Sequence, residues 1–202
     1  MKVLQVFLMV MGVLAILAII ALIIGYILAF LTPDIRSSMR PVVLSSEAVD
    51  SLNEKIVDLK KSVATAESTK TQKDIEFVMT EEEINSALVM MLAEGTLPAK
   101  EILVNFNDGY LLTYTAWNVP GLPLKTGIFG QIEVEDGKPK MFVRDFFLGK
   151  LAVPDEIDRG VENLANIIIK LNIPLEELRL TIKDVTIGEG QMRISAVTKA
   201  AK

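Results

Sequence analysis

The 202-residue sequence contains no cysteine and no histidine. Without these side chains the protein has no disulfide, no thiolate nucleophile, no Cys/His zinc site and no Ser-His-Asp arrangement. Acyl transfer would need an unusual Ser-Lys pair, and no serine lies in a recognisable nucleophile motif. We therefore expect a protein that is not an enzyme, with no catalytic residue, no bound metal and no cofactor.

Charged residues are missing from the start of the chain, where Lys2 is the only one before Asp34. The uncharged run, residues 3–33, is far longer than the roughly 18 apolar residues that indicate a membrane span. As a helix, residues 3–31 would be about 43 Å long, which is enough to cross a hydrocarbon core of about 30 Å. The run is also longer than the apolar region of a cleavable signal peptide, and no small-residue cleavage site ends it. We predict that residues 1–33 form an uncleaved transmembrane anchor.

The charged residues argue against some classes of partner, but they say little about the side of the membrane on which the domain lies. Asp34 and the residues after it hold all 26 acidic residues and every basic residue except Lys2, so this part is acidic. An acidic chain disfavours nucleic acid as a partner and gives no polybasic attraction to anionic lipid. Arg36 and Arg40 lean slightly toward a cytoplasmic domain, but long C-terminal domains translocate largely regardless of such small differences.

A second helix is predicted after the anchor. Ser45 is a candidate N-cap, and apolar residues follow at spacings of three and four over residues 49–66. This stripe is shorter than the three to four heptads of a coiled coil, so a stalk helix resting on the domain or the membrane and a paired helix both stay open. The polar residues 65–73 are interpreted as a linker. Residues 34–73 then form a juxtamembrane segment, and residues 74–202 the main domain.

The main domain has the pattern of an α+β fold, in which two helices pack on an antiparallel sheet. A short strand over residues 74–79 enters a Thr-x-x-Glu capping box at Thr80, and the helix that follows should end near Gly95. In that helix, Asn85 is expected to be solvated or locally hydrogen-bonded. Residues 154–171 are predicted to form another helix. Alternating apolar residues and short turns predict six further strands, at residues 102–106, 110–117, 128–134, 140–148, 180–187 and 192–197.

The strands and the second of these helices carry more apolar residues than one packing face needs. In residues 141–148, alternation places Met141, Val143 and Phe147 on one face and Phe142 and Phe146 on the other. Two interpretations stay open. The sheet is covered on both sides by helices, or its concave face and a helix enclose an apolar cavity.

Several motifs resemble those of the YpmS-like family of membrane-anchored bacterial proteins. They are Thr80-Glu81-Glu82-Glu83-Ile84-Asn85 at a helix start, an Asp-Gly hairpin, Glu135-Asp136-Gly137-Lys138-Pro139, and Leu148-Gly149-Lys150-Leu151-Ala152-Val153-Pro154 before a helix. The arrangement is also similar to LmeA-like phospholipid-binding proteins and, more distantly, to the tubular lipid-binding (TULIP-like) domains. The resemblance covers residues 77–197. It implies a domain outside the cytoplasmic membrane, with a long helix lying in a curved sheet around an acyl-chain groove, and it supplies no catalytic residue.

The candidate site residues follow from this interpretation. Trp117 and Lys150 are candidates for the portal of the groove, as an interfacial aromatic residue and as a partner for a lipid phosphate, although a rim or core aromatic and a solvated lysine are the more common explanations of such residues. Gly149 is expected to permit a positive φ or a close approach where the strand leaves the sheet. The candidates for the groove lining are Leu112, Tyr114, Phe142, Phe147, Ile157, Val161, Leu164 and Ile168.

These observations favour a single-pass protein of the cytoplasmic membrane whose extracytoplasmic domain binds lipid, or another hydrophobic ligand, in a groove between sheet and helix. The alternative is a structural or assembly factor that binds another envelope protein through the stalk or an exposed strand edge. An enzyme is the third interpretation. It would use Asp155, Glu156 and Asp158 as paired carboxylates, but a helix start explains this acidic cluster without catalysis.

Overall fold

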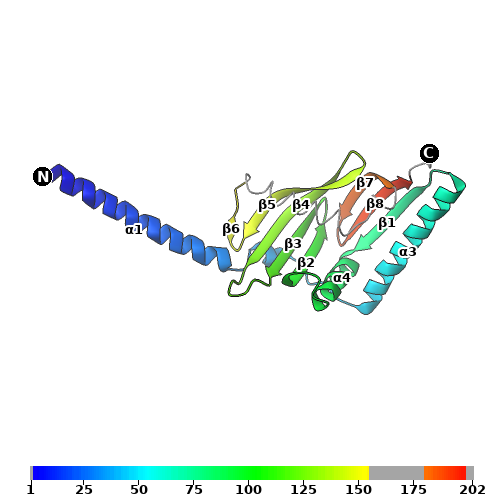
Figure 1. The fold of residues 1–202 in the computed structure, drawn as a ribbon, viewed down its shortest axis with the longest axis horizontal. Coiled ribbons are helices and arrows are strands. Elements are labelled where there is room, and N and C mark those ends of the chain that lie inside the picture. Colours follow the sequence, from blue (N-terminus) through cyan, green and yellow to red (C-terminus); the bar gives the residue numbers. More distant parts are fainter. Residues whose placement is uncertain (1, 155–179, 199–202) are drawn as a thin grey trace.

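A computed structural model of the chain shows a long helix that projects away from a body of two antiparallel sheets and packed helices (Figure 1). The structure describes residues 2–154 and 180–198. The predicted α+β class is confirmed, and the two sheets do not close into one. The predicted helix over residues 154–171 lies outside the described residues, except for Pro154.

The projecting helix is α1 (Lys2–Phe30). Its described side chains are exposed from Met11 to Ile24, and it has no polar face that water could solvate. Among the described residues, one helical stretch is long and apolar enough to cross a membrane, and α1 makes up most of it. This arrangement fits a single-pass membrane protein.

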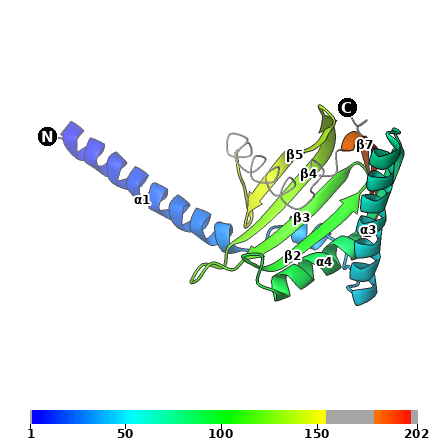
Figure 2. The same ribbon diagram turned by 45° about the vertical axis from the view of Figure 1, so that its right-hand side comes forward.

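The chain returns to the body through α2 (Ile35–Ser38) and then forms α3 (Ser46–Thr69). The predicted cap is present, since the Ser45 hydroxyl accepts a hydrogen bond from the Ala48 backbone N–H. The helix continues to Thr69, so the interpretation of residues 65–69 as linker is wrong. Leu52 and Val63 of α3 are buried in the main core cluster. Figure 2 shows α3 beside α4, at the opposite end of the molecule from α1.

The strands predicted from alternation are all present, with ends that differ by a few residues. Sheet order is β1-β8-β7 in the three-stranded sheet and β2-β3-β4-β5-β6 in the five-stranded sheet, and every neighbouring pair is antiparallel. The capping box at Thr80 is also present and starts α4 (Glu81–Ala93). The strands are β1 (Asp74–Thr80), β2 (Ala99–Asn107), β3 (Tyr110–Trp117), β4 (Lys125–Glu135), β5 (Lys138–Leu148), β6 (Leu151–Ala152), β7 (Leu180–Gly188) and β8 (Gln191–Thr198).

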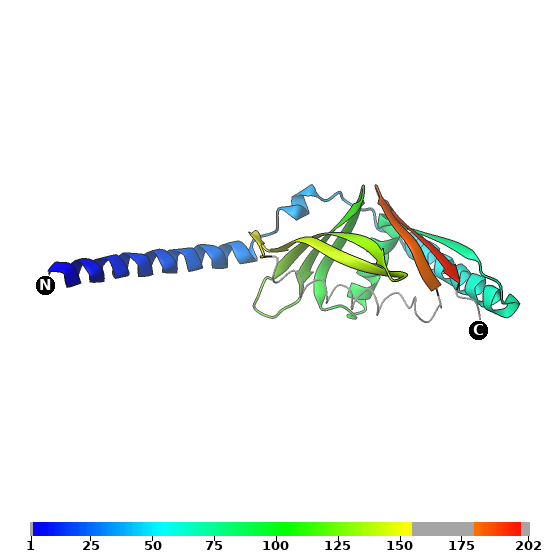
Figure 3. The ribbon, with the colours of Figure 1, turned by 90° about the horizontal axis from the view of Figure 1, so that it is seen from above.

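The division into two sheets was not visible in the alternation pattern. Backbone hydrogen bonds join the sheets, from Gly109 N–H to Ile187 C=O (2.8 Å) and from Ile182 N–H to Gly137 C=O (2.9 Å). Seen from above, the sheets lie next to each other, with α3 beyond the three-stranded one (Figure 3). The main core cluster draws on both sheets, α3 and α4.

A bulge in β5 corrects the face assignment made from alternation. Phe129 of β4 pairs with Asp145, but the next residue pairs with Val143, so Arg144 is an extra residue in β5. An extra residue reverses the faces of all residues beyond it. Val143 and Phe146 therefore both join the core cluster, while Phe142 and Phe147 share the opposite face.

Candidate functional site at the junction of anchor and domain

The end of α1 is held by the turn between β5 and β6. The Lys150 backbone N–H donates to the Leu28 carbonyl oxygen at 2.8 Å, which satisfies one of the free carbonyls of a helix C-terminus. Gly149 has φ +57°, and a Cβ at this position would lie 2.3 Å from the Leu28 oxygen. Both expectations for Gly149, a positive φ and a close approach, are confirmed.

The first residues of β4 make a second contact with the junction. The Lys125 Nζ donates to the Thr32 hydroxyl oxygen at 2.8 Å. Gly127 lies against Ile35, whose Cγ2 would be 2.4 Å from a Cβ added to the glycine. Because only a residue without a side chain fits there, β4 packs directly on the segment that follows α1.

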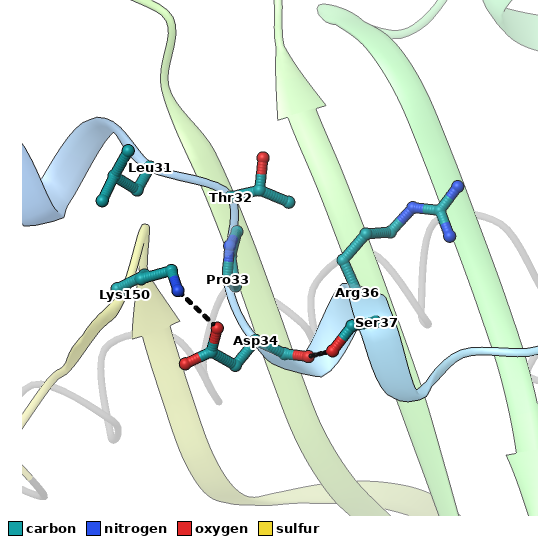
Figure 4. A pocket seen from close by; sticks show the side chains of 7 residues that line it. All are labelled: Leu31, Thr32, Pro33, Asp34, Arg36, Ser37 and Lys150. Atoms are coloured by element: carbon teal, nitrogen blue, oxygen red, sulfur yellow. Dashed lines mark hydrogen bonds and ion pairs between the residues drawn. The ribbon is translucent and has the colours of Figure 1, made fainter.

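An open hollow of about 430 Å³ lies at this junction (Figure 4). Its cations are Lys150, which pairs with Asp34 at 2.8 Å, and Arg36, which pairs with Glu101 at 3.1 Å. The Ser37 hydroxyl donates to the Asp34 carbonyl oxygen. Two cations, a carboxylate and hydroxyls suit a ligand that carries both a phosphate and an ammonium group. The lining consists of Leu31, Thr32, Pro33, Asp34, Arg36, Ser37 and Lys150.

The four groove candidates within the described residues lie on one face of the five-stranded sheet. Leu112 and Tyr114 are buried there and pack in a second cluster with Met39, from the segment that follows α2. Phe142 and Phe147 are half-buried on the same face. The other four candidates, Ile157, Val161, Leu164 and Ile168, lie outside the described residues. The part of the sheet beneath Met39 is therefore filled by the chain's own side chains.

Tyr114 is the most buried aromatic residue of this face, with 3% of its surface exposed. Burial raises the pKa of its phenol, the Glu101 carboxylate raises it further, and Arg36 opposes both. The Arg36 guanidinium lies 5.4 Å from the centre of the Tyr114 ring. Arg36, one of the two cations of the hollow, thus also packs on the sheet face through its contact with the Tyr114 ring.

The two portal candidates are placed at the anchor end of the domain. Lys150 lines the hollow, where its side chain is 41% exposed and pairs with the exposed Asp34, so both interpretations of this lysine stay open. Trp117 is half-buried, and its indole N–H donates to the Thr126 hydroxyl oxygen at 2.9 Å. Trp117 thereby closes the base of the loop that joins β3 to β4.

A buried polar cluster was missed by the sequence interpretation. Asn85 is fully buried, which contradicts the expected solvation, although its bond to the Glu81 carbonyl oxygen (2.7 Å) is local, as expected. Its side chain also accepts from the Val104 backbone N–H at 2.8 Å and donates to the Val104 carbonyl oxygen at 2.7 Å. Asn85 therefore does for the edge of β2 what a neighbouring strand would do.

Glu81 and Arg40 complete this cluster and attach the juxtamembrane segment to it. Glu81 accepts from the Phe106 backbone N–H at 2.5 Å and from Arg40 at 2.7 Å. Arg40 also donates to the Phe106 carbonyl oxygen at 2.7 Å, and its own backbone N–H donates to the Asn105 side chain at 2.6 Å. The hydrogen bond to Glu81 raises the pKa of Arg40 against the effect of burial. The sequence signal for this cluster was Asn105, the one polar residue in the predicted strand 102–106.

A second buried carboxylate ties α3 to α4. Glu83, 4% exposed, pairs with Lys55 at 2.6 Å and accepts from the Ser51 hydroxyl at 2.7 Å and from the Thr80 backbone N–H at 3.0 Å. Burial acts to raise the pKa of Glu83, but these hydrogen bonds outweigh it and lower the pKa below its ordinary value. Together with Leu52 and Val63 in the core, this contact makes α3 part of the packed body.

Comparison with protein-family models, with curated proteins and with solved structures gives no match for this chain. The similarity to the YpmS-like family and to TULIP-like domains therefore stays a prediction. Within residues 2–154 and 180–198, no three acidic side chains gather in a way that could hold a metal ion.

Proposed function

We propose that the protein is a membrane-anchored, non-catalytic module of the cell envelope that binds a lipid or another hydrophobic ligand. The observation that carries this proposal is the hollow at the end of α1, which places Lys150, Asp34 and Arg36 next to the membrane helix. A lipid headgroup is the ligand that meets such a site without leaving the bilayer surface. Its phosphate would pair with Lys150 and Arg36, and an amine would pair with Asp34.

The hollow adjoins the sheet face that carries the groove candidates. Pro33 lines the hollow and would lie 3.4 Å from a Cβ on Gly127. Gly127 pairs with Tyr114 on one side and with Phe147 on the other. An acyl chain that continues from a headgroup in the hollow would therefore run along Phe147 and Phe142, since Leu112 and Tyr114 are already covered.

Lipid retention by the full chain tests this proposal. The protein is purified from membranes in a mild detergent and its bound lipids are measured by native mass spectrometry. Lys150→Ala keeps the backbone N–H that bonds Leu28 but removes the cation, so we expect less retained phospholipid. Lys183→Ala is the matched control, because Lys183 is also half-exposed and paired with an exposed carboxylate, Asp74, on another element. It should retain as much lipid as the parent.

Equal lipid retention by the parent and both variants would refute a specific headgroup site. Absence of bound lipid from the parent would refute the proposal as a whole and leave the alternative, a structural or assembly factor that binds another envelope protein. We also propose that the domain lies outside the cytoplasmic membrane, as the family resemblance implies. Protease added to intact protoplasts should then digest the domain, and full protection would reverse the orientation.

A further inference from the structure

The loop that joins β3 to β4, residues 118–124, is uncharged and exposes apolar side chains. Val119 and Leu122 are 36% and 45% exposed, although they belong to an ordered turn in which the Leu122 N–H donates to the Val119 carbonyl oxygen at 3.1 Å. The base is closed by a hydrogen bond from the Trp117 N–H to the Leu124 carbonyl oxygen at 2.9 Å. The apolar tip is therefore ordered and leaves part of both side chains uncovered by the described residues.

This loop lies at the end of the domain from which the membrane helix leaves. Figures 1 and 2 show it projecting on the same side as α1. The contact between Lys125 Nζ and the Thr32 hydroxyl (2.8 Å) joins the last residue of the loop base to the second residue after α1. The loop base therefore lies next to the C-terminal end of α1.

The sequence of α1 places the loop base near the bilayer surface. Its 29 residues measure about 44 Å, enough to cross a hydrocarbon core of about 30 Å, and no charged residue lies between Lys2 and Asp34. The Leu28 carbonyl bonds the domain through Lys150, so the domain begins at the last turn of this uncharged helix. Trp117 and Lys125 flank the loop, and an aromatic and a basic residue are the side chains that favour the membrane interface.

We infer that the β3–β4 loop inserts its apolar tip into the interfacial layer of the bilayer beside α1. The domain then has two contacts with the membrane, the anchor and the loop, and two contacts fix its orientation where a single helix would let it swivel. This inference depends on the anchor alone. It holds whether or not the hollow binds a lipid headgroup, so the two proposals fail separately.

The absence of cysteine from the chain allows a direct test. Leu122→Cys is labelled with a polarity-sensitive fluorophore, and the full chain is reconstituted into vesicles of phosphatidylethanolamine and phosphatidylglycerol. Val57→Cys is the matched control, because Val57 is an equally exposed apolar residue (47%) on α3, at the far end of the molecule. We expect a blue-shifted emission and strong quenching by brominated lipids at position 122, and neither at position 57.

A label at position 122 that is no more quenched by brominated lipid than the label at position 57 would overturn the inference. A blue shift without lipid quenching would also overturn it, because the loop would then be covered by protein. Val119→Cys provides a second labelled position on the same turn. It should repeat the result of Leu122→Cys if the tip as a whole is inserted.

Discussion

Asn85 offers the sharpest test of how the domain is held together. Its amide bonds both backbone groups of Val104, and Val104 lies on β2, which is an edge strand among the described strands. Asn85→Ala removes the amide and leaves the Val104 N–H and C=O without these partners. The void left by the truncated side chain is closed to water, because Asn85 is fully buried.

The expected loss follows from these two backbone groups. A buried donor or acceptor that loses its partner costs about 1–3 kcal/mol. The Val104 carbonyl oxygen keeps the hydrogen bond from the Asn105 side chain (3.1 Å), so the loss is less than that of two isolated groups, and we expect Asn85→Ala to lower the free energy of unfolding by about 2–5 kcal/mol. That is a large share of the roughly 5–15 kcal/mol by which a domain is stable.

Urea unfolding of the full chain in detergent micelles measures this loss, with circular dichroism and the fluorescence of Trp117 as two probes of one transition. Asn53→Ala is the control, since Asn53 is an exposed residue in the interior of α3. It should change stability by no more than about 0.5 kcal/mol. If Asn85→Ala unfolds at the same urea concentration as Asn53→Ala, the amide does not support the strand edge.

The parts of the fold that were predicted correctly depend on neighbouring residues. Strands follow from alternation, and the capping box at Thr80 follows from the spacing of a hydroxyl and a carboxylate. Gly149 was predicted because a turn that leaves a sheet needs a residue free to adopt a positive φ. In each case the residues that decide the structure lie within a few positions of each other.

The parts that were missed depend on partners far apart in the chain. The bulge at Arg144 is decided by pairing with β4, and no local pattern marks an extra residue. Asn85 and Val104 are 19 residues apart, and Arg40 and Glu81 are 41 apart. A polar residue in a helix gives no indication of a partner at that distance, so Asn85 was interpreted as solvated or locally hydrogen-bonded, and only the local bond to Glu81 was anticipated. The hollow is of the same kind, because Lys150 and Asp34 meet only through the fold.

Three further predictions concern the turn that holds α1, the contribution of α3 to folding, and the dependence of stability on pH. Gly149→Ala should lower the melting temperature more than Gly95→Ala. Both glycines have positive φ, but only Gly149 of the two has backbone oxygen atoms where the new Cβ would lie. Equal decreases in melting temperature would show that the contact between this turn and α1 does not contribute to stability. A chain that begins at Asp74 should not melt cooperatively, since it lacks Leu52 and the rest of α3 in the core, and a sharp transition would show that α3 is dispensable. Glu83 should make stability depend on acidity. Its pKa is lowered on folding, so its contribution is complete above the unfolded pKa of about 4.3 and is lost as the pH falls through the lower, folded value. Urea midpoints measured from neutral pH down through this range should therefore fall more steeply for the parent than for Glu83→Gln, which cannot titrate. Parallel curves would show that Lys55 and Ser51 do not hold the carboxylate in its charged form.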